Sequence, residues 1–345
     1  MALILSALAH RYDSQTVLDD FSLTVEPGEV VALLGASGSG KSTVLRLVAG
    51  LLPLQNGAIR WADTVLATPG QEIPPERRSV GLMFQDHVLF PHLTAADNLA
   101  FGLGHLPKAD RREQVRGWLE RVGLAGLAER YPHTLSGGQQ QRLALARALA
   151  TEPQVMLLDE PFANVDSARR RALREDARLT LKAAGAATIV VTHDPDEALE
   201  LADRVAVLEA GRIVQCGEPE SVWSTPATLA VAELFGDSQR VPVRRQGAQL
   251  QSAFGAVTGV AGAAGASDGD RALMLVRDEA LSLVPGAGAQ IIDHRFASGR
   301  TVAVVEAENC RLRVPIAGPS AFPLGGRANV IIDPRGARLY PEPAR

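Results

Sequence analysis

A glycine-rich segment, Gly35-Ala-Ser-Gly-Ser-Gly-Lys-Ser42, joins a short apolar run at 30–34 to a helical pattern over 41–50. Its glycines let backbone N–H groups turn toward phosphate oxygens, and the helix start adds the positive end of its dipole. Lys41 would place a cation beside the β- and γ-phosphates of a nucleotide, and the Ser42 hydroxyl would ligate Mg²⁺. A chance glycine-rich turn is the alternative, but the strand–loop–helix context favours a phosphate site. The residues expected to bind the nucleotide here are Gly35, Ala36, Ser37, Gly38, Ser39, Gly40, Lys41, Ser42 and Thr43.

The pattern of buried strands and helices predicts two kinds of fold in one chain. Continuous apolar runs at 30–34, 155–158 and 187–191 alternate with helical patterns at 41–50, 108–122, 137–150 and 166–184, which indicates a parallel α/β sheet. Past residue 240 only short strand-like runs remain, at 273–276, 281–284, 301–307, 311–316 and 330–332. Residues 255–269 have the glycine and alanine content of a loop. We therefore expect a small β-barrel or sandwich after the α/β domain.

Composition excludes several classes of protein. Of 345 residues, 46% are hydrophobic, which is enough for a sizeable core and argues against a disordered chain. The net charge of −4 argues against a general binder of nucleic acid or anionic membrane. Cys216 and Cys310 lie far apart, so neither a disulfide framework nor a zinc site is indicated. No run of 18 apolar residues predicts a membrane span, and the N-terminal residues predict a strand and not a signal peptide.

Two adjacent acids end the apolar run at 155–158. Asp159 can hold Mg²⁺ through water, as acids after a hydrophobic strand do in phosphate-loop enzymes. Glu160 can act as a general base on an attacking water. Read alone, the pair could simply cap a strand end before Pro161, but the phosphate loop upstream favours the catalytic interpretation.

A second helix start of the same chemical kind lies at Leu135-Ser-Gly-Gly-Gln-Gln-Gln-Arg142. Ser136 is suited to cap the helix, and the two glycines after it leave N–H groups open to an anion. An ordinary capped helix is the alternative, because Ser-Gly-Gly is common in turns.

The phosphate loop, the LSGGQ segment and the strand ending in Asp-Glu-Pro, in this order, resemble the nucleotide-binding subunit of ATP-binding cassette (ABC) transporters. The resemblance covers about residues 1–235. It implies an ATPase domain, placed at 1–238, with a parallel sheet core, an antiparallel β subdomain and a helical subdomain. It also implies roles for four further residues: Tyr12 stacks on adenine, Gln85 contacts metal and water, Asp166 is the D-loop acid, and His193 bonds the γ-phosphate.

In this family two copies pair head to tail. The helix that begins with the LSGGQ segment, the signature helix, thus faces the ATP that the other copy holds. The resemblance thus assigns Ser136, Gly137, Gly138, Gln139 and Asp166 to the site of a partner copy. ATP and Mg²⁺ are the implied cofactors, and the catalytic set is Glu160, His193, Gln85 and Lys41, with Ser42, Gln85 and Asp159 at the metal. Closure on the γ-phosphate and release after hydrolysis would perform the mechanical work.

A single cassette followed by a β-rich tail resembles bacterial importer ATPases that carry a TOBE-like regulatory domain, here expected at 239–345. The resemblance implies membrane permease partners, a periplasmic solute-binding protein acting indirectly, and a peripheral place on the cytoplasmic face of the inner membrane. The signature and Asp-Glu-Pro segments look most like ferric-iron importers, with sulfate, polyamine and thiamine importers as alternatives. The tail would either stabilise the dimer or sense a ligand. A soluble ABC protein acting on ribosomes or DNA is the alternative from another class, but no second phosphate loop or heptad pattern supports it.

Overall fold

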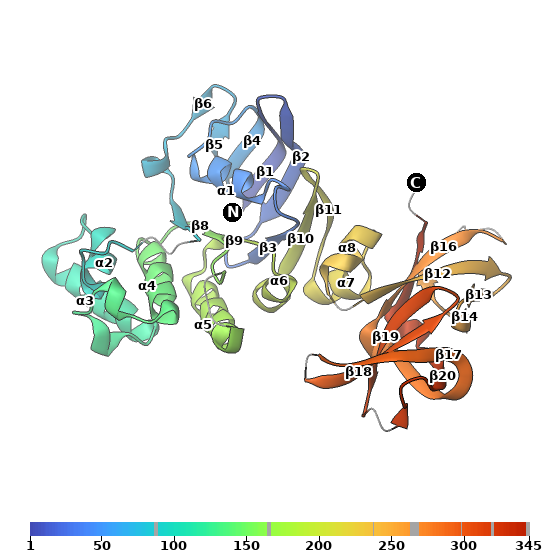
Figure 1. Cartoon of the computed structure of the whole chain (residues 1–345). Coiled ribbons are helices and arrows are strands. Elements are labelled where there is room, and N and C mark those ends of the chain that lie inside the picture. The colour runs from blue at the N-terminus through green and yellow to red at the C-terminus, as the bar shows by residue number, and fades with distance from the viewer. Residues whose placement is uncertain are drawn as a thin grey trace. The chain divides into compact units, whose positions relative to one another are not determined.

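The computed structural model divides into two compact units, residues 1–227 and 228–345, each described here by itself (Figure 1). The structure describes residues 1–85, 89–163, 167–236, 238–262, 269–297, 299–318 and 321–342. Within these ranges, no helix combines the length and apolar character needed to cross a membrane.

A six-stranded sheet in the order β11-β10-β3-β9-β8-β7 forms the centre of the first unit. All neighbours in it are parallel except the final β10–β11 hairpin. Its strands are β3 (Val30–Leu34), β7 (Val80–Met83), β8 (Val155–Asp159), β9 (Ala187–Thr192), β10 (Arg204–Glu209) and β11 (Arg212–Gly217). The predicted parallel α/β class is therefore confirmed.

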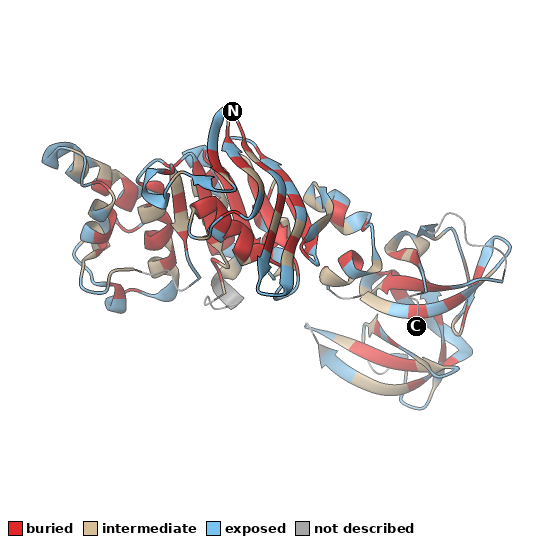
Figure 2. Ribbon diagram, turned by 90° about the horizontal axis from the view of Figure 1, so that it is seen from above, coloured by how far each residue is buried: buried red, intermediate tan, exposed pale blue. Residues whose placement is uncertain are grey.

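Both faces of this sheet are covered, which explains why its strands are continuous apolar runs (Figure 2). In β8, Val155 and Leu157 pack into the core that holds α1 (Lys41–Ala49). Met156 and Leu158, on the opposite face, pack into the core of the helical part of the unit. Successive side chains of one strand thus enter two different cores.

A second, antiparallel sheet in the order β2-β1-β4-β5-β6 packs over α1. Its strands are β1 (Leu3–Tyr12), β2 (Gln15–Val25), β4 (Asn56–Trp61), β5 (Thr64–Thr68) and β6 (Gln71–Glu72). β1 is the strand predicted for the N-terminal residues. β4 pairs with β1 across more than forty residues of chain, and β5 and β6 extend the sheet from β4.

The other helices of the first unit pack on the central sheet or on one another. They are α2 (Ala95–Phe101), α3 (Lys108–Arg121), α4 (Gly137–Leu149), α5 (Ser167–Ala184), α6 (Pro195–Leu201) and α7 (Pro219–Ser224). Short 3₁₀ segments lie at Pro75–Arg77, Ala125–Leu127 and Pro132–Thr134. The helices predicted over 108–122, 137–150 and 166–184 are each present within one residue at either end.

Two packed sheets make up most of the second unit, with the orders β14-β13-β12-β16-β21-β15 and β19-β18-β17-β20. Their elements are α8 (Leu229–Leu234), β12 (Ser238–Gln246), β13 (Gln249–Ser252), β14 (Gly255–Thr258), β15 (Ala261–Gly262), β16 (Arg271–Arg277), β17 (Leu281–Ala297), β18 (Arg300–Ala307), β19 (Cys310–Ile316), β20 (Arg327–Ile332) and β21 (Ala337–Pro341), with 3₁₀ segments at Asp278–Ala280 and Pro334–Gly336. The barrel-like β fold is confirmed. The loop expected over 255–269 is wrong at its start, because β14 pairs there with β13.

Candidate functional site

The glycine-rich segment forms the loop between β3 and α1, as its sequence predicts. A Cβ atom at Gly35 would lie 2.4 Å from the carbonyl oxygen of Leu208 in the neighbouring strand β10, so no larger residue fits there. Gly40 adopts φ +107°, a left-handed conformation that L-residues with side chains rarely reach. With glycine at these two positions the loop can lie close to the sheet, and α1 begins at the next residue, Lys41.

Lys41 is buried within the loop that it follows. Its Nζ donates to the carbonyl oxygens of Gly35 and Ala36, both at 2.8 Å. Burial lowers the pKa of Lys41, while the nearby carboxylates of Glu160 and Asp159 act in the opposite direction. The ammonium group is thus held among phosphate-loop atoms and beside the acids at the end of β8.

A cleft of about 300 Å³ opens over this loop. Tyr12, at the end of β1, lines it together with Glu160, so the aromatic residue and the acid predicted from the sequence meet at one cavity. The remaining lining residues are Gln15, Val17, Ser37, Gly38, Gly40, Lys41, Ser42 and Thr43. Gln15 and Val17 are additions that sequence reasoning missed. Their signal was their place just after Tyr12, in the strand that pairs back on β1.

Ser42 and Asp159 supply two oxygen atoms suited to a magnesium ion. The Ser42 hydroxyl donates to Asp159 Oδ1 at 3.4 Å. Burial, followed by the neighbouring charge of Glu160, raises the pKa of Asp159. A divalent cation would offset both effects. Mg²⁺ prefers hard oxygen ligands and takes one or two protein groups plus substrate phosphates, so these residues fit it. Within the described ranges, no cluster of three His, Cys, Asp or Glu side chains offers a fuller metal cage.

Glu160 and His193 form a pair at the carboxyl ends of β8 and β9. His193 Nδ1 lies 3.0 Å from Glu160 Oε1. Glu160 has φ +44°, an uncommon conformation for a glutamate, and its N–H donates to the carbonyl oxygen of Val191 at 2.9 Å. Adjacent parallel strands bring these side chains to the same sheet edge as the phosphate loop. An acid fixed beside a histidine at a phosphate cleft is suited to activate water.

The signature segment lies apart from the cleft, at the start of α4. Ser136 caps the helix, since its hydroxyl accepts from Gln139 N–H while Gln139 Oε1 accepts from Ser136 N–H at 2.9 Å. Gly138 packs so closely on α5 that a Cβ there would lie 3.0 Å from Leu173 Cδ1. Around Gly137, by contrast, a Cβ would meet nothing within 4 Å. The helix start is therefore rigid, with its first residue open.

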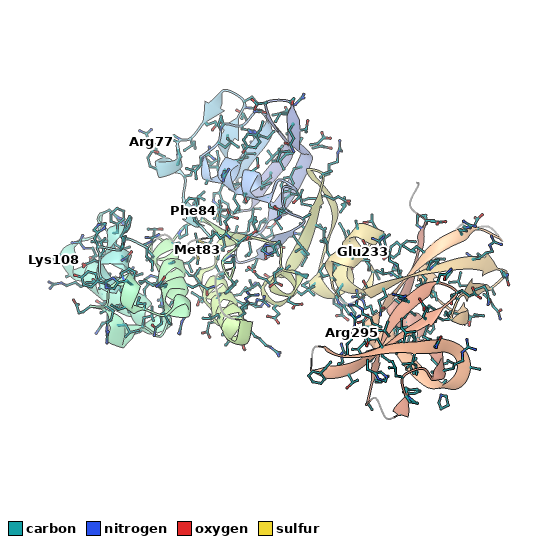
Figure 3. All side chains as sticks on the ribbon, viewed as in Figure 1. Arg77, Met83, Phe84, Lys108, Glu233 and Arg295 are labelled. Atoms are coloured by element: carbon teal, nitrogen blue, oxygen red, sulfur yellow. The ribbon has the colours of Figure 1, made fainter. Side chains whose placement is uncertain are left out.

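The predicted site residue Gln85 lies away from the cleft over the phosphate loop. Gln85 is exposed just beyond β7 and is not among the cleft-lining residues. The residues before it, Met83 and Phe84, lie where the helical part meets the central sheet (Figure 3). Asp166 lies outside the described residues.

A strand–phosphate loop–helix unit with an acidic pair at the end of a parallel strand defines a P-loop nucleoside triphosphatase. The family described as ABC transporter matches residues 18–163. The sulfate/thiosulfate import ATP-binding protein CysA of Brucella melitensis is 40% identical over 333 residues, 94% of this chain and 91% of that protein. The chain therefore belongs to the ABC transporter family, as an ATPase of that family.

A second relative and a solved structure are also similar to this chain. The Fe(3+) ions import ATP-binding protein FbpC of Agrobacterium fabrum is 45% identical over 229 residues, 66% of this chain and 64% of that protein. The solved structure of a dimeric bacterial ABC transporter cassette is 28% identical with a TM-score of 0.55, covering 63% of this chain and 98% of its own. The predicted family is thus confirmed.

Proposed function

We propose that residues 1–238 are the ATP-hydrolysing motor of a solute importer and that residues 239–345 are its TOBE-like regulatory domain. The observation that carries the proposal is the Glu160–His193 pair, 3.0 Å apart, at the edge of the cleft that contains Lys41. The import function of the relatives from Brucella and Agrobacterium supports the direction of transport.

The residues of the cleft divide the chemistry among them. Tyr12 stacks on the adenine, and the loop N–H groups with Lys41 hold the phosphates. Glu160 orients the attacking water and accepts its proton, and His193 fixes Glu160 and reaches the γ-phosphate. Ser42 and Asp159 would hold Mg²⁺, which neutralises charge on the phosphates when bound. Gln85, which does not line the cleft in this structure, would have to move toward it to join them.

A second copy of the chain completes the site in this proposal. Ser136, Gly137, Gly138 and Gln139 lie outside the cleft of their own subunit, yet they form a capped helix start with an open first residue. Such a helix start binds an anion, and the γ-phosphate in the partner's cleft supplies one. Asp166 is assigned to the same interface. The dimeric state of the similar solved cassette supports this arrangement.

The relatives support the proposed partners and narrow the candidate cargo. As an import subunit, the chain would dock on membrane permease subunits at the cytoplasmic face of the inner membrane and serve a periplasmic binding protein. Ferric iron is the cargo that the signature and Asp-Glu-Pro segments favour. Sulfate is a second candidate, because the similarity to the sulfate relative spans 94% of this chain and thus includes the second unit.

Changing Glu160→Gln tests the motor. Loss of the base should lower ATP turnover roughly 10²–10⁴-fold while leaving ATP affinity within about twofold, because the phosphate ligands stay. Lys41→Ala should instead weaken ATP binding. Glu152→Gln, an exposed carboxylate near the other end of β8, is the matched control and should behave like the unmodified chain. Normal turnover in the Glu160→Gln protein would refute the assignment of the base.

Reconstitution with its permease tests the cargo. ATPase activity should rise when a binding protein loaded with ferric iron is added, and sulfate-loaded binding protein is the parallel arm. Stimulation by sulfate alone would replace iron with sulfate. Stimulation by neither would reject both candidates.

A further inference from the structure

Glu197 is a buried acid that the chemistry above leaves unused. It lies in the first turn of α6, only 3% exposed. Its Oε2 accepts a hydrogen bond from the Thr192 hydroxyl at 2.9 Å. Its Oε1 is buried and has no hydrogen-bond partner in the part of the chain that the structure describes. A charged carboxylate with one hydrogen bond at such a depth would be strongly destabilised.

The cation whose charge acts on Glu197 is hydrogen-bonded to other acids. Arg174, a buried residue of α5, donates to Asp194 Oδ2 at 2.6 Å and to Glu200 Oε2 at 3.2 Å. Burial raises the pKa of Glu197 to about 8; Asp194 and Glu160 act in the same direction, and Thr192 and Arg174 oppose it. The groups that face Glu197 thus leave it protonated at neutral pH.

Thr192 connects this acid to the catalytic pair. Its hydroxyl oxygen donates to Glu197 and accepts from the backbone N–H of Asp194 at 3.0 Å. Asp194 in turn caps α6, accepting from the N–H groups of Asp196 and Glu197. Both neighbours of His193 are therefore fixed by one hydrogen-bonded turn, so the histidine has little freedom except in its own side chain.

We propose that protonated Glu197 is a positioning residue for ATP hydrolysis, which holds Thr192 and so fixes His193 against Glu160. The inference rests on the proposed roles of Glu160 and His193. Ionisation of Glu197 would add a negative charge to the region of Glu160. It would also strengthen the hydrogen bond that Glu197 accepts and so draw the Thr192 hydroxyl toward it. Turnover should then fall as pH rises through about 8, whereas ATP affinity should not, because Glu197 does not line the cleft.

The experiment compares the full chain with its Glu197→Gln and Asp196→Asn variants between pH 6 and 10. Glutamine keeps an oxygen for Thr192 but cannot ionise, so kcat at pH 7 should stay within about twofold and the alkaline fall should disappear. Asp196 is the exposed neighbour on the same helix, and Asp196→Asn should keep the fall. KM for ATP should match in all three proteins.

A second pair of variants keeps the proposal falsifiable if Glu197→Gln does not fold. Thr192→Val removes the hydroxyl and should lower kcat at least tenfold at unchanged KM, and Thr192→Ser should restore it. The proposal is overturned if Glu197→Gln retains the alkaline fall or loses more than tenfold of kcat at pH 7 while folded, or if Thr192→Val is as active as Thr192→Ser. Full turnover after Glu160→Gln or His193→Ala would instead refute the proposed function.

Discussion

Burial is the main influence on the pKa values of three side chains in the ATPase domain, Lys41, Asp159 and Glu197. It lowers the pKa of Lys41 and raises the pKa values of Asp159 and Glu197, because in each case it disfavours the charged form. Lys41 compensates with two carbonyl partners, and Asp159 has the Ser42 hydroxyl. Of these groups, Asp159 is the acid beside the phosphate loop. A cation bound there would therefore lower the pKa of Asp159 more than that of Glu197.

The Mg²⁺ dependence of ATPase activity tests the role of Asp159. Asparagine keeps the shape of the side chain but removes the charge that attracts Mg²⁺, directly or through water. We expect Asp159→Asn to raise the Mg²⁺ concentration for half-maximal ATPase activity about 10–100-fold. Titrating MgCl₂ at saturating ATP measures it. Asp63→Asn, in the exposed turn between β4 and β5, is the control, and an identical Mg²⁺ curve for Asp159→Asn would contradict the assignment.

Among the elements, α1 depends on one side chain at its end. The buried guanidinium of Arg78 donates to the carbonyl oxygens of Leu47 and Val48 in the last turn of α1, at 2.8 and 2.9 Å. It also donates to the carbonyl oxygen of Ile73 at 2.7 Å. The final carbonyls of a helix have no partner within the helix, so Arg78 supplies what α1 cannot.

Replacing Arg78 with methionine should therefore destabilise the first unit. The carbonyl oxygens of Leu47, Val48 and Ile73 would each lose one hydrogen bond, which costs about 2–4 kcal/mol of unfolding free energy. Chemical denaturation followed by circular dichroism measures the loss. Arg77→Met is the matched control, since Arg77 is the exposed neighbour (Figure 3) and its replacement should change stability by less than about 0.5 kcal/mol. Equal stabilities for the two variants would show that Arg78 does not support α1.

The phosphate cleft and the signature helix lie in different parts of the first unit. The cleft lies at the edge of the central sheet, and the signature residues begin α4 in the helical part. In the proposed head-to-tail pair, the cleft of each subunit would be completed by the signature helix of the other. That arrangement requires a nucleotide for assembly and predicts a change of mass on binding.

Light scattering should show this change of mass. The Glu160→Gln protein, which should hold ATP without hydrolysing it, is expected to dimerise with Mg²⁺ and ATP and to be monomeric without them. Adding Gly137→Asp should keep it monomeric at unchanged ATP affinity, because a Cβ there meets no described residue within 4 Å and the new carboxylate would face the partner's phosphate. A Glu160→Gln protein that stays monomeric with ATP would contradict the dimer.

The sequence predicts those structural features that are determined by residues close together along the chain. The strand–loop–helix at Lys41 and the acids after β8 are visible because apolar runs and motif spacing are local. Strands β4–β6 and β12–β14 do not stand out in the sequence because their apolar runs are short, even though each set is joined by local hairpins. Arg78 and Glu197 were equally hidden. An arginine after a proline-rich turn and a glutamate in a first helical turn look like surface residues, and only tertiary packing buries them.

The backbone bond from Glu160 to Val191 has a mechanical consequence. Because this bond ties Glu160 to β9, the strand that leads to His193, a displacement of the end of β9 would move Glu160 and His193 together. Their mutual spacing survives the movement, and only their reach to the nucleotide changes. Conformational control in such a subunit would be all-or-none, because the pair engages or withdraws together.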